Sequence, residues 1–350
     1  STLALINLAS MYENGRGTKR DVAKAVELGE KAYAAGWTLA SINLGFIYNF
    51  GGLGEPDAVK ARFWFEKGAD AKLPQAMAAL AVLLRQGSGG PADLPRAREL
   101  YAAAAELGYI EGTYGLALMT LKGEGGPADV PAAIALFEKA ANAGHAAAAV
   151  DLGRIYELGT GVEVDFAVAR KWFAAAAALN EPRGFYNLGL LDIDKKAGTP
   201  DYQSALRNFE KGAKLGHAAS MFEIGLFYDA ALVGPRDAEL AFAWYTKAVK
   251  AGDVPALHNL ANLYDQGQGT KADPVMAAAL YYRSLAAGTT FTITQFTKPI
   301  VLIRTATRVE LQKLLAARAG YDGPMDGKVN NAMIAAMARL AGADPAKFVK

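Results

Sequence analysis

The stretch DFAVARKWFAAAAALN, from Asp165 to Asn180, decides the fold because its landmarks recur every 36 residues. Its opening aspartate belongs to a series of eight, which are Asp21, Asp57, Asp93, Asp129, Asp165, Asp201, Asp237 and Asp273. An alanine follows each aspartate by four residues, and an aromatic residue follows it by eight in every copy except the first, which has Gly29. A period of this length is typical of a solenoid. We therefore predict an all-α stack of eight helix–turn–helix repeats.

Each repeat is expected to have a first helix before the aspartate and a second helix after it. The first helix carries an apolar anchor followed directly by a small residue, and these small residues are Ala9, Gly45, Ala81, Ala117, Gly153, Gly189, Gly225 and Ala261. Glycine inside a helix costs about 0.5–1 kcal/mol relative to alanine, so its recurrence predicts a neighbouring helix that approaches too closely for a side chain. The aspartates are interpreted as helix N-caps rather than metal ligands, and the glycine-rich turns as helix ends rather than phosphate loops.

Composition narrows the classes of function. The chain has 37 basic and 35 acidic residues, a net charge of +2, and no cysteine. With so small a net charge, the chain has no strong electrostatic field that would attract nucleic acid or an anionic membrane. The lack of cysteine excludes disulfides, thiol catalysis and cysteine-bound zinc. No apolar run approaches the roughly 20 residues of a membrane span, so we expect no membrane insertion. Because Ser1 lies in what looks like a helix already under way, we expect a fragment of a longer protein.

The recurring pattern, with Leu-Gly in the first helix, a glycine pair in the turn and Asp-x-x-x-Ala in the second helix, resembles the Sel-one-like repeat. This relative of the tetratricopeptide repeat is matched over residues 1–289. The resemblance implies a right-handed α-solenoid of antiparallel helix pairs that acts as a scaffold for protein–protein interaction, often in bacterial envelope and signalling proteins, without enzyme activity. The sixth and seventh repeats lack the usual glycine pair, and their turns are expected to differ in shape.

First helices line the inner wall of such solenoids, so a groove is expected along two rows of their residues. One row is rich in asparagine, whose side chain could form hydrogen bonds with the backbone of an extended peptide. The alternative is that these side chains form hydrogen bonds within the helix. The other row carries aromatic rings, which could anchor a partner or pack between repeats. The candidate partner-binding residues are Asn43, Tyr114, Asp151, Tyr186, Asn187, Phe222, Glu223, His258 and Asn259. His145 and His217 lie too far apart to share a metal and are interpreted as helix caps.

The sequence changes character after the repeats. Residues 290–303 alternate Thr with Phe and Ile, which predicts a linker or a short extended segment, and Pro299 would break a helix. Residues 304–350 resemble a peptidoglycan-binding domain of type 1, with matches at Leu311, Gln312, Leu314, Gly320, Tyr321, Gly323, Asp326 and Gly327. Tyr321, Asp322 and Asp326 are the candidate glycan-binding residues. The family's closing Phe-Gln is missing, so a helical cap on the last repeat is the alternative.

No catalytic constellation emerges, since three histidines, no cysteine and scattered carboxylates leave no nucleophile with its base. We predict a scaffold without enzyme activity, metal or cofactor, which binds a protein or peptide in the groove and is held at the bacterial cell envelope or periplasm. A cytoplasmic location is the alternative. Two other functions stay open: a regulatory arm of an enzyme whose catalytic domain precedes residue 1, and carbohydrate binding through Tyr114, Tyr186 and Phe222.

Overall fold

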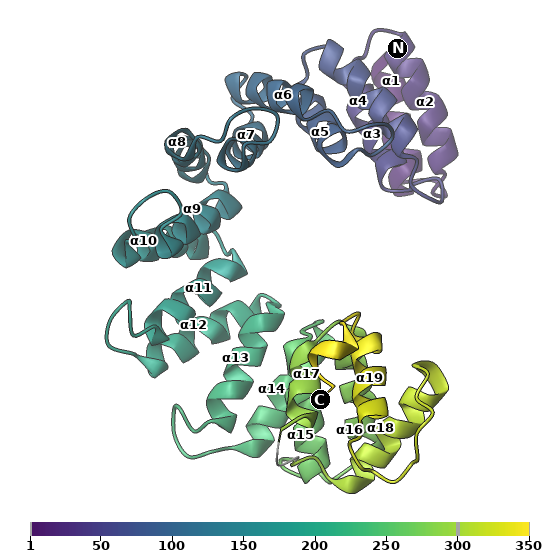
Figure 1. The fold of residues 1–350 in the computed structure, drawn as a ribbon. Coiled ribbons are helices and arrows are strands. Elements are labelled where there is room, and N and C mark those ends of the chain that lie inside the picture. The colour runs from purple at the N-terminus through teal and green to yellow at the C-terminus, as the bar shows by residue number, and fades with distance from the viewer. Residues whose placement is uncertain (1, 299–301, 350) are drawn as a thin grey trace. The chain divides into compact units, whose positions relative to one another are not determined.

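The structure is a computed structural model that describes residues 2–298 and 302–349. Nineteen α-helices and one short 3-10 helix form in these ranges, and the described residues contain no β-strand. The predicted all-α repeat architecture is therefore confirmed. The helices divide into two compact units, Ser1–Leu179 and Asn180–Lys350 (Figure 1).

The first unit contains five antiparallel helix pairs in which an odd-numbered helix packs on the next even-numbered one. The ten helices are α1 (Thr2–Asn14), α2 (Val22–Ala34), α3 (Ala40–Asn49), α4 (Ala58–Asp70), α5 (Pro74–Gln86), α6 (Leu94–Glu106), α7 (Ile110–Lys122), α8 (Val130–Asn142), α9 (Ala146–Leu158) and α10 (Phe166–Ala178).

The second unit contains three further pairs and three additional helices. The pairs are α11 (Pro182–Ile193) with α12 (Tyr202–Lys214), α13 (Ala218–Asp229) with α14 (Ala238–Lys250), and α15 (Pro255–Gln266) with α16 (Pro274–Ala286). The additional helices are α17 (Thr290–Phe296), α18 (Thr305–Arg318) and α19 (Asn331–Leu340), and the 3-10 helix η1 (Pro345–Lys347) follows them.

The repeated aspartates cap the second helix of every repeat. The Oδ1 of Asp57, for example, accepts a hydrogen bond from the backbone N–H of Lys60 at 2.9 Å. All eight aspartates accept such a bond from the first turn, so the N-cap interpretation is confirmed. His145 and His217 cap α9 and α13 in the same way, through ring nitrogens 3.1 and 3.3 Å from backbone nitrogens, as predicted.

The turn after α11 differs from the common form, as expected for the sixth repeat. Where α5 ends on Gly87 in the left-handed region, at φ 69°, α11 ends on Asp194 in an extended conformation. Asp194 caps the turn by accepting a hydrogen bond from the backbone N–H of Lys196 at 2.8 Å. A side-chain bond therefore takes the place of glycine at this helix end.

In the four repeats whose small residue is glycine, the buried ring of the second helix lies against that glycine. A Cβ on Gly153 would lie 2.5 Å from the ring of Phe173, and one on Gly225 would lie 2.6 Å from the ring of Tyr245. Real Cβ atoms do not approach so closely, so the predicted tight helix crossing is confirmed. All seven rings are at most 5% exposed, and they are Phe65, Tyr101, Phe137, Phe173, Phe209, Tyr245 and Tyr281.

The expected extended segment after the repeats is wrong for residues 290–296, which form α17. Ile293 and Phe296 are three residues apart, which places them on one helical face, and both are buried. They join a core that also contains Leu280 of α16, Leu311 of α18 and Met337 of α19. The three-residue spacing of Ile293 and Phe296 therefore predicts the observed helix better than the alternation of threonine with apolar residues does. Pro299, which is expected to break a helix, lies outside the described residues.

Adding a methyl group beside a ring should destabilise the first unit. Gly153→Ala is expected to lower the free energy of unfolding by about 1–3 kcal/mol, the usual cost of overpacking, as measured by urea denaturation. Gly29→Ala is the matched control, because its Cβ would meet only the movable Leu44 side chain at 3.1 Å. Equal losses in the two variants would contradict the close-packing explanation.

Candidate functional site

The aromatic row of the predicted groove is held by contacts with its own repeat and the next. Tyr114 of α7 lies with its ring centroid 4.2 Å from that of His145 in a stacked arrangement, and 6.0 Å from that of Phe137. Its hydroxyl donates a hydrogen bond to the Oδ2 of Asp151 on α9 at 2.9 Å. The structure thus brings Tyr114 and Asp151 together, and His145 covers one face of the tyrosine ring.

A related arrangement, with the tyrosine and histidine rings tilted rather than stacked, occurs in the second unit. The ring centroid of Tyr186 lies 5.9 Å from that of Phe209 and 5.0 Å from that of His217. Phe222 lies 5.8 Å from Tyr245. Tyr186 and Phe222 are both half-buried, so packing between helices positions them while part of each ring stays accessible.

The asparagine row does not form a uniform ladder. Asn43 is exposed, whereas Asn187 is buried. Asn259 uses its Nδ2 to donate a hydrogen bond to the hydroxyl of Tyr245 at 3.1 Å. Asn259 therefore takes part in the packing between repeats and Asn187 is buried, whereas Asn43 is exposed.

Glu223 on α13 carries a half-buried carboxyl group that pairs with no basic side chain in the described part of the chain. Burial, together with the nearby carboxylate of Asp253, raises the pKa of Glu223 to about 7. Burial also raises the pKa of Asp253 and of Tyr186, and for Tyr186 the charges of Glu223 and Asp253 add to the effect. Among the described residues no basic side chain forms an ion pair with Glu223. A cationic group placed here would favour the ionised form of Glu223.

His258, the last candidate of the aromatic row, is an interior residue. Its ring is 4% exposed, and its Nδ1 lies 3.1 Å from the Oγ1 of Thr292 on α17. Burial, together with the positive charge of Lys298, lowers the pKa of His258 to about 4. His258 is therefore neutral at physiological pH, and α17 covers the side expected to face a partner.

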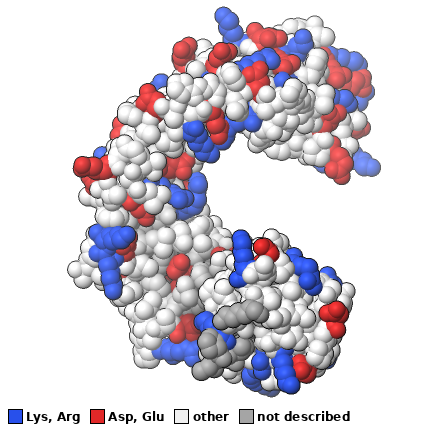
Figure 2. Space-filling model, viewed as in Figure 1, with Lys and Arg blue, Asp and Glu red and all other residues white. Residues whose placement is uncertain are grey.

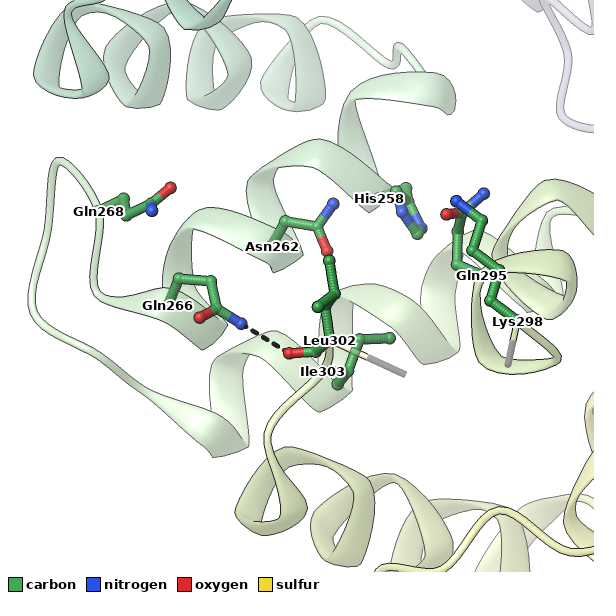
Figure 3. A pocket seen from close by; sticks show the side chains of 8 residues that line it. All are labelled: His258, Asn262, Gln266, Gln268, Gln295, Lys298, Leu302 and Ile303. Atoms are coloured by element: carbon green, nitrogen blue, oxygen red, sulfur yellow. Dashed lines mark hydrogen bonds between the residues drawn. The ribbon is translucent and has the colours of Figure 1, made fainter. Parts of the chain in front are cut away.

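A pocket of about 360 Å³, lined in part by amide side chains, adjoins His258 and was not foreseen from the sequence. Figure 3 shows side-chain amides from α15, the following turn and α17 around it, together with Lys298. The Nε2 of Gln266 donates a hydrogen bond to the backbone oxygen of Leu302 at 3.1 Å, and the Oδ1 of Asn262 accepts one from the hydroxyl of Tyr281. Because Gln295 and Lys298 lie beyond the last repeat, repeat spacing could not reveal that they meet the amides of α15.

Of the candidate glycan-binding residues, Tyr321 lies in the core. Its ring is 4% exposed and its hydroxyl donates a hydrogen bond to the backbone oxygen of Pro324 at 2.8 Å. Asp322 and Asp326 are exposed on the turn between α18 and α19. The Oδ1 of Asp326 accepts a hydrogen bond from the backbone N–H of Lys328 at 2.9 Å, which lowers the pKa of Asp326. Tyr321 therefore braces the turn and has no free face for a sugar ring.

Within residues 2–298 and 302–349, no cluster of three or more His, Asp or Glu side chains could hold a metal ion. No helix in the described part of the chain combines the length and apolar character that crossing a membrane requires. Figure 2 shows positive and negative side chains interspersed on the visible face of each unit. The surface in view thus offers mixed charge and no broad region of one sign.

Removing the Glu223 charge should stabilise the protein in a pH-dependent way. Because the pKa is about 7 in the folded protein against an ordinary 4.5, the unfolded state loses its proton first and folding is penalised above pH 4.5. The penalty is complete above pH 7 and reaches about 3 kcal/mol. Glu223→Gln should raise the unfolding free energy at pH 8 and have little effect at pH 4. Asp322→Asn, at an exposed carboxylate, is the control, and an equal gain for Glu223→Gln at both pH values would contradict the burial effect.

Comparison with known proteins gives the family. The Sel1 repeat model matches residues 2–37, 38–73, 74–109, 110–145, 146–181, 186–217, 218–253 and 254–289. The structure is similar to that of a protective antigen of uropathogenic Escherichia coli strains with an SLR fold, at 25% identity and a TM-score of 0.66, over 97% of this chain and 76% of that one. It is also similar to a Sel1 repeat protein of Oxalobacter formigenes, at 24% identity and a TM-score of 0.68, over 83% of this chain and 85% of that one. No curated protein matches the sequence. With eight consecutive matches over most of its length, the chain belongs to the Sel1 repeat family.

Proposed function

We propose that this Sel1 repeat protein is a non-enzymatic scaffold that binds a protein partner along the first helices of its second unit, where Glu223 receives a basic side chain. Sel1 repeat proteins generally act in protein–protein interaction. The observation that carries the proposal for this surface is the half-buried Glu223 carboxyl, which has no counter-charge among the described residues. Glu223 interacts electrostatically with Asp253 and Tyr186.

A lysine or arginine of a partner would complete this environment. Bringing a positive charge to Glu223 would lower its pKa from about 7 and form a charge-assisted hydrogen bond, which is stronger than a neutral one. The accessible parts of Tyr186 and Phe222 would add apolar contact beside the charge. Aromatic residues of this kind often contribute most of the binding energy at interfaces.

Peptide selection tests this proposal without a known partner. A random peptide library is selected on the immobilised full chain at pH 7.5, and the selected peptides are then tested on the Glu223→Gln variant. We expect enrichment of lysine or arginine and at least tenfold weaker binding to the variant, since truncating a charged interface pair commonly costs more than 2 kcal/mol. Asp322→Asn is the control and should leave binding unchanged. Selected peptides without basic residues, or peptides that bind both proteins equally, would refute the role of Glu223.

We further propose that the chain is held at the bacterial envelope by contact of its C-terminal turn with peptidoglycan. The observation that favours this second function is the braced turn between α18 and α19. The Oε1 of Gln312 accepts a hydrogen bond from the backbone N–H of Gly327 at 2.8 Å, and its Nε2 donates one to the oxygen of Lys328 at 2.9 Å. The exposed carboxylates of Asp322 and Asp326 are thereby presented on a fixed backbone.

Co-sedimentation with insoluble peptidoglycan checks this second proposal. The wild-type chain should sediment, and the double variant Asp322→Ala, Asp326→Asn should lose most of that binding. The asparagine keeps an oxygen that can accept the Lys328 bond, so the turn should persist. Asp344→Asn is the control at another exposed cap. Failure of the wild-type chain to sediment would refute the peptidoglycan contact and leave the C-terminal helices only their packing on the last repeat.

A further inference from the structure

The first repeat has a cavity where the other repeats hold a ring. Position 29 is glycine, whereas the equivalent residue of the seven other repeats is a buried Phe or Tyr. A cavity of about 270 Å³ lies beside Gly29 between α1, α2 and α3. A cavity of roughly 150 Å³ is already enough to bind benzene, so the missing ring leaves space for an aromatic group.

The surroundings of Tyr245 show what this cavity is shaped to hold. The ring of Tyr245 lies against Phe222 and against the backbone of Gly225, with the contacts given above. Its hydroxyl lies 3.5 Å from the Oδ2 of Asp229 and receives a hydrogen bond from Asn259. These neighbours provide an apolar slot for the ring and a polar end for the hydroxyl.

Six repeats earlier, 216 residues back along the sequence, the same positions line the cavity. Ile6 corresponds to Phe222, Ala9 to Gly225, Glu13 to Asp229 and Asn43 to Asn259. Tyr281, which is 252 residues and seven repeats after Gly29, supplies a second comparison. Its hydroxyl donates a hydrogen bond to the Oδ1 of Asn262, and Asn262 corresponds over the same seven repeats to Ser10. The cavity therefore keeps the walls and the polar end of a tyrosine site but lacks the tyrosine.

We propose that this cavity binds an aromatic side chain of a protein partner, with tyrosine preferred to phenylalanine. This inference rests on the proposed scaffold function and adds a second recognition site in the first unit. The exposed side chains of Ser10 and Asn43 stand at the cavity, so a partner side chain can reach it from solvent. A phenol hydroxyl bound there meets Asn43 and Glu13, whereas a phenyl ring would leave those polar groups unused.

Small analogues of the two side chains test the site on the full chain. Titration with p-cresol, followed by amide chemical shifts in NMR spectra, should give saturable changes at Ala9, Gly29 and Leu44. Toluene should bind at least fivefold more weakly. Asn43→Leu should bring the affinity for p-cresol down to that for toluene. Equal affinities of the two probes for the wild-type chain would overturn the preference for tyrosine.

Filling the cavity from within gives the decisive variant. Gly29→Tyr supplies the missing ring and should abolish p-cresol binding while raising the midpoint of thermal unfolding. Glu30→Tyr is the matched control, because it adds the same ring to an exposed neighbouring position of α2 and should leave binding intact. Unchanged p-cresol binding in Gly29→Tyr would overturn the assignment of the site. If Gly29→Tyr does not fold, the Asn43→Leu titration tests the assignment of the site alone, and an unchanged affinity of that variant for p-cresol would overturn it.

The partner is tested separately from the pocket. Peptides selected on the wild-type chain and counter-selected on Gly29→Tyr should contain tyrosine, and p-cresol should compete with them. If p-cresol binds as expected but no tyrosine peptide distinguishes the two proteins, the site takes free phenols and the proposal of a protein partner is wrong. Since Glu223 lies in the other unit, its own selection reports on the scaffold function independently.

Discussion

The contact between a second-helix ring and a glycine of its first helix is the constraint on which the rest of the structure depends. It sets how closely the two helices of a repeat can approach, because the ring occupies the place of a side chain on the partner helix. Once that distance is fixed, the capping aspartate and the turn determine where the next helix begins. A repeat array is stabilised by such contacts within repeats and between neighbours, so one ring and one small residue, repeated every 36 positions, account for most of the architecture.

The residues that define this contact also explain why the fold could be predicted from the sequence. The period is visible without any structure, and the functions of Asp57, Gly153 and Phe173 follow from helix capping and close packing. Local capping was equally predictable, since His145 immediately precedes a first helix and follows a glycine. These features depend on spacing and local chemistry alone.

The candidate site was harder to predict because exposure depends on neighbours that spacing does not reveal. Tyr114 and Asp151 were expected in the groove, and their mutual hydrogen bond follows only from the distance between α7 and α9. His258 was placed in the groove because the position recurs, but α17 covers it, and the helical character of α17 was hidden by its alternating threonines. Tyr321 matched a family pattern and proved to be a core residue. The raised pKa of Glu223 required the actual burial of its carboxyl group.

The way in which α17, α18 and α19 share one core with α16 has a consequence for self-assembly. A solenoid whose last repeat ended in a bare apolar face could accept the first repeat of another copy, and head-to-tail contacts of that kind generate open filaments. Ile293, Leu311 and Met337 occupy that face from within the same chain. The C-terminal end of the stack is thereby closed to polymerisation, and growth of a fibre from that end would require the three helices to be displaced first.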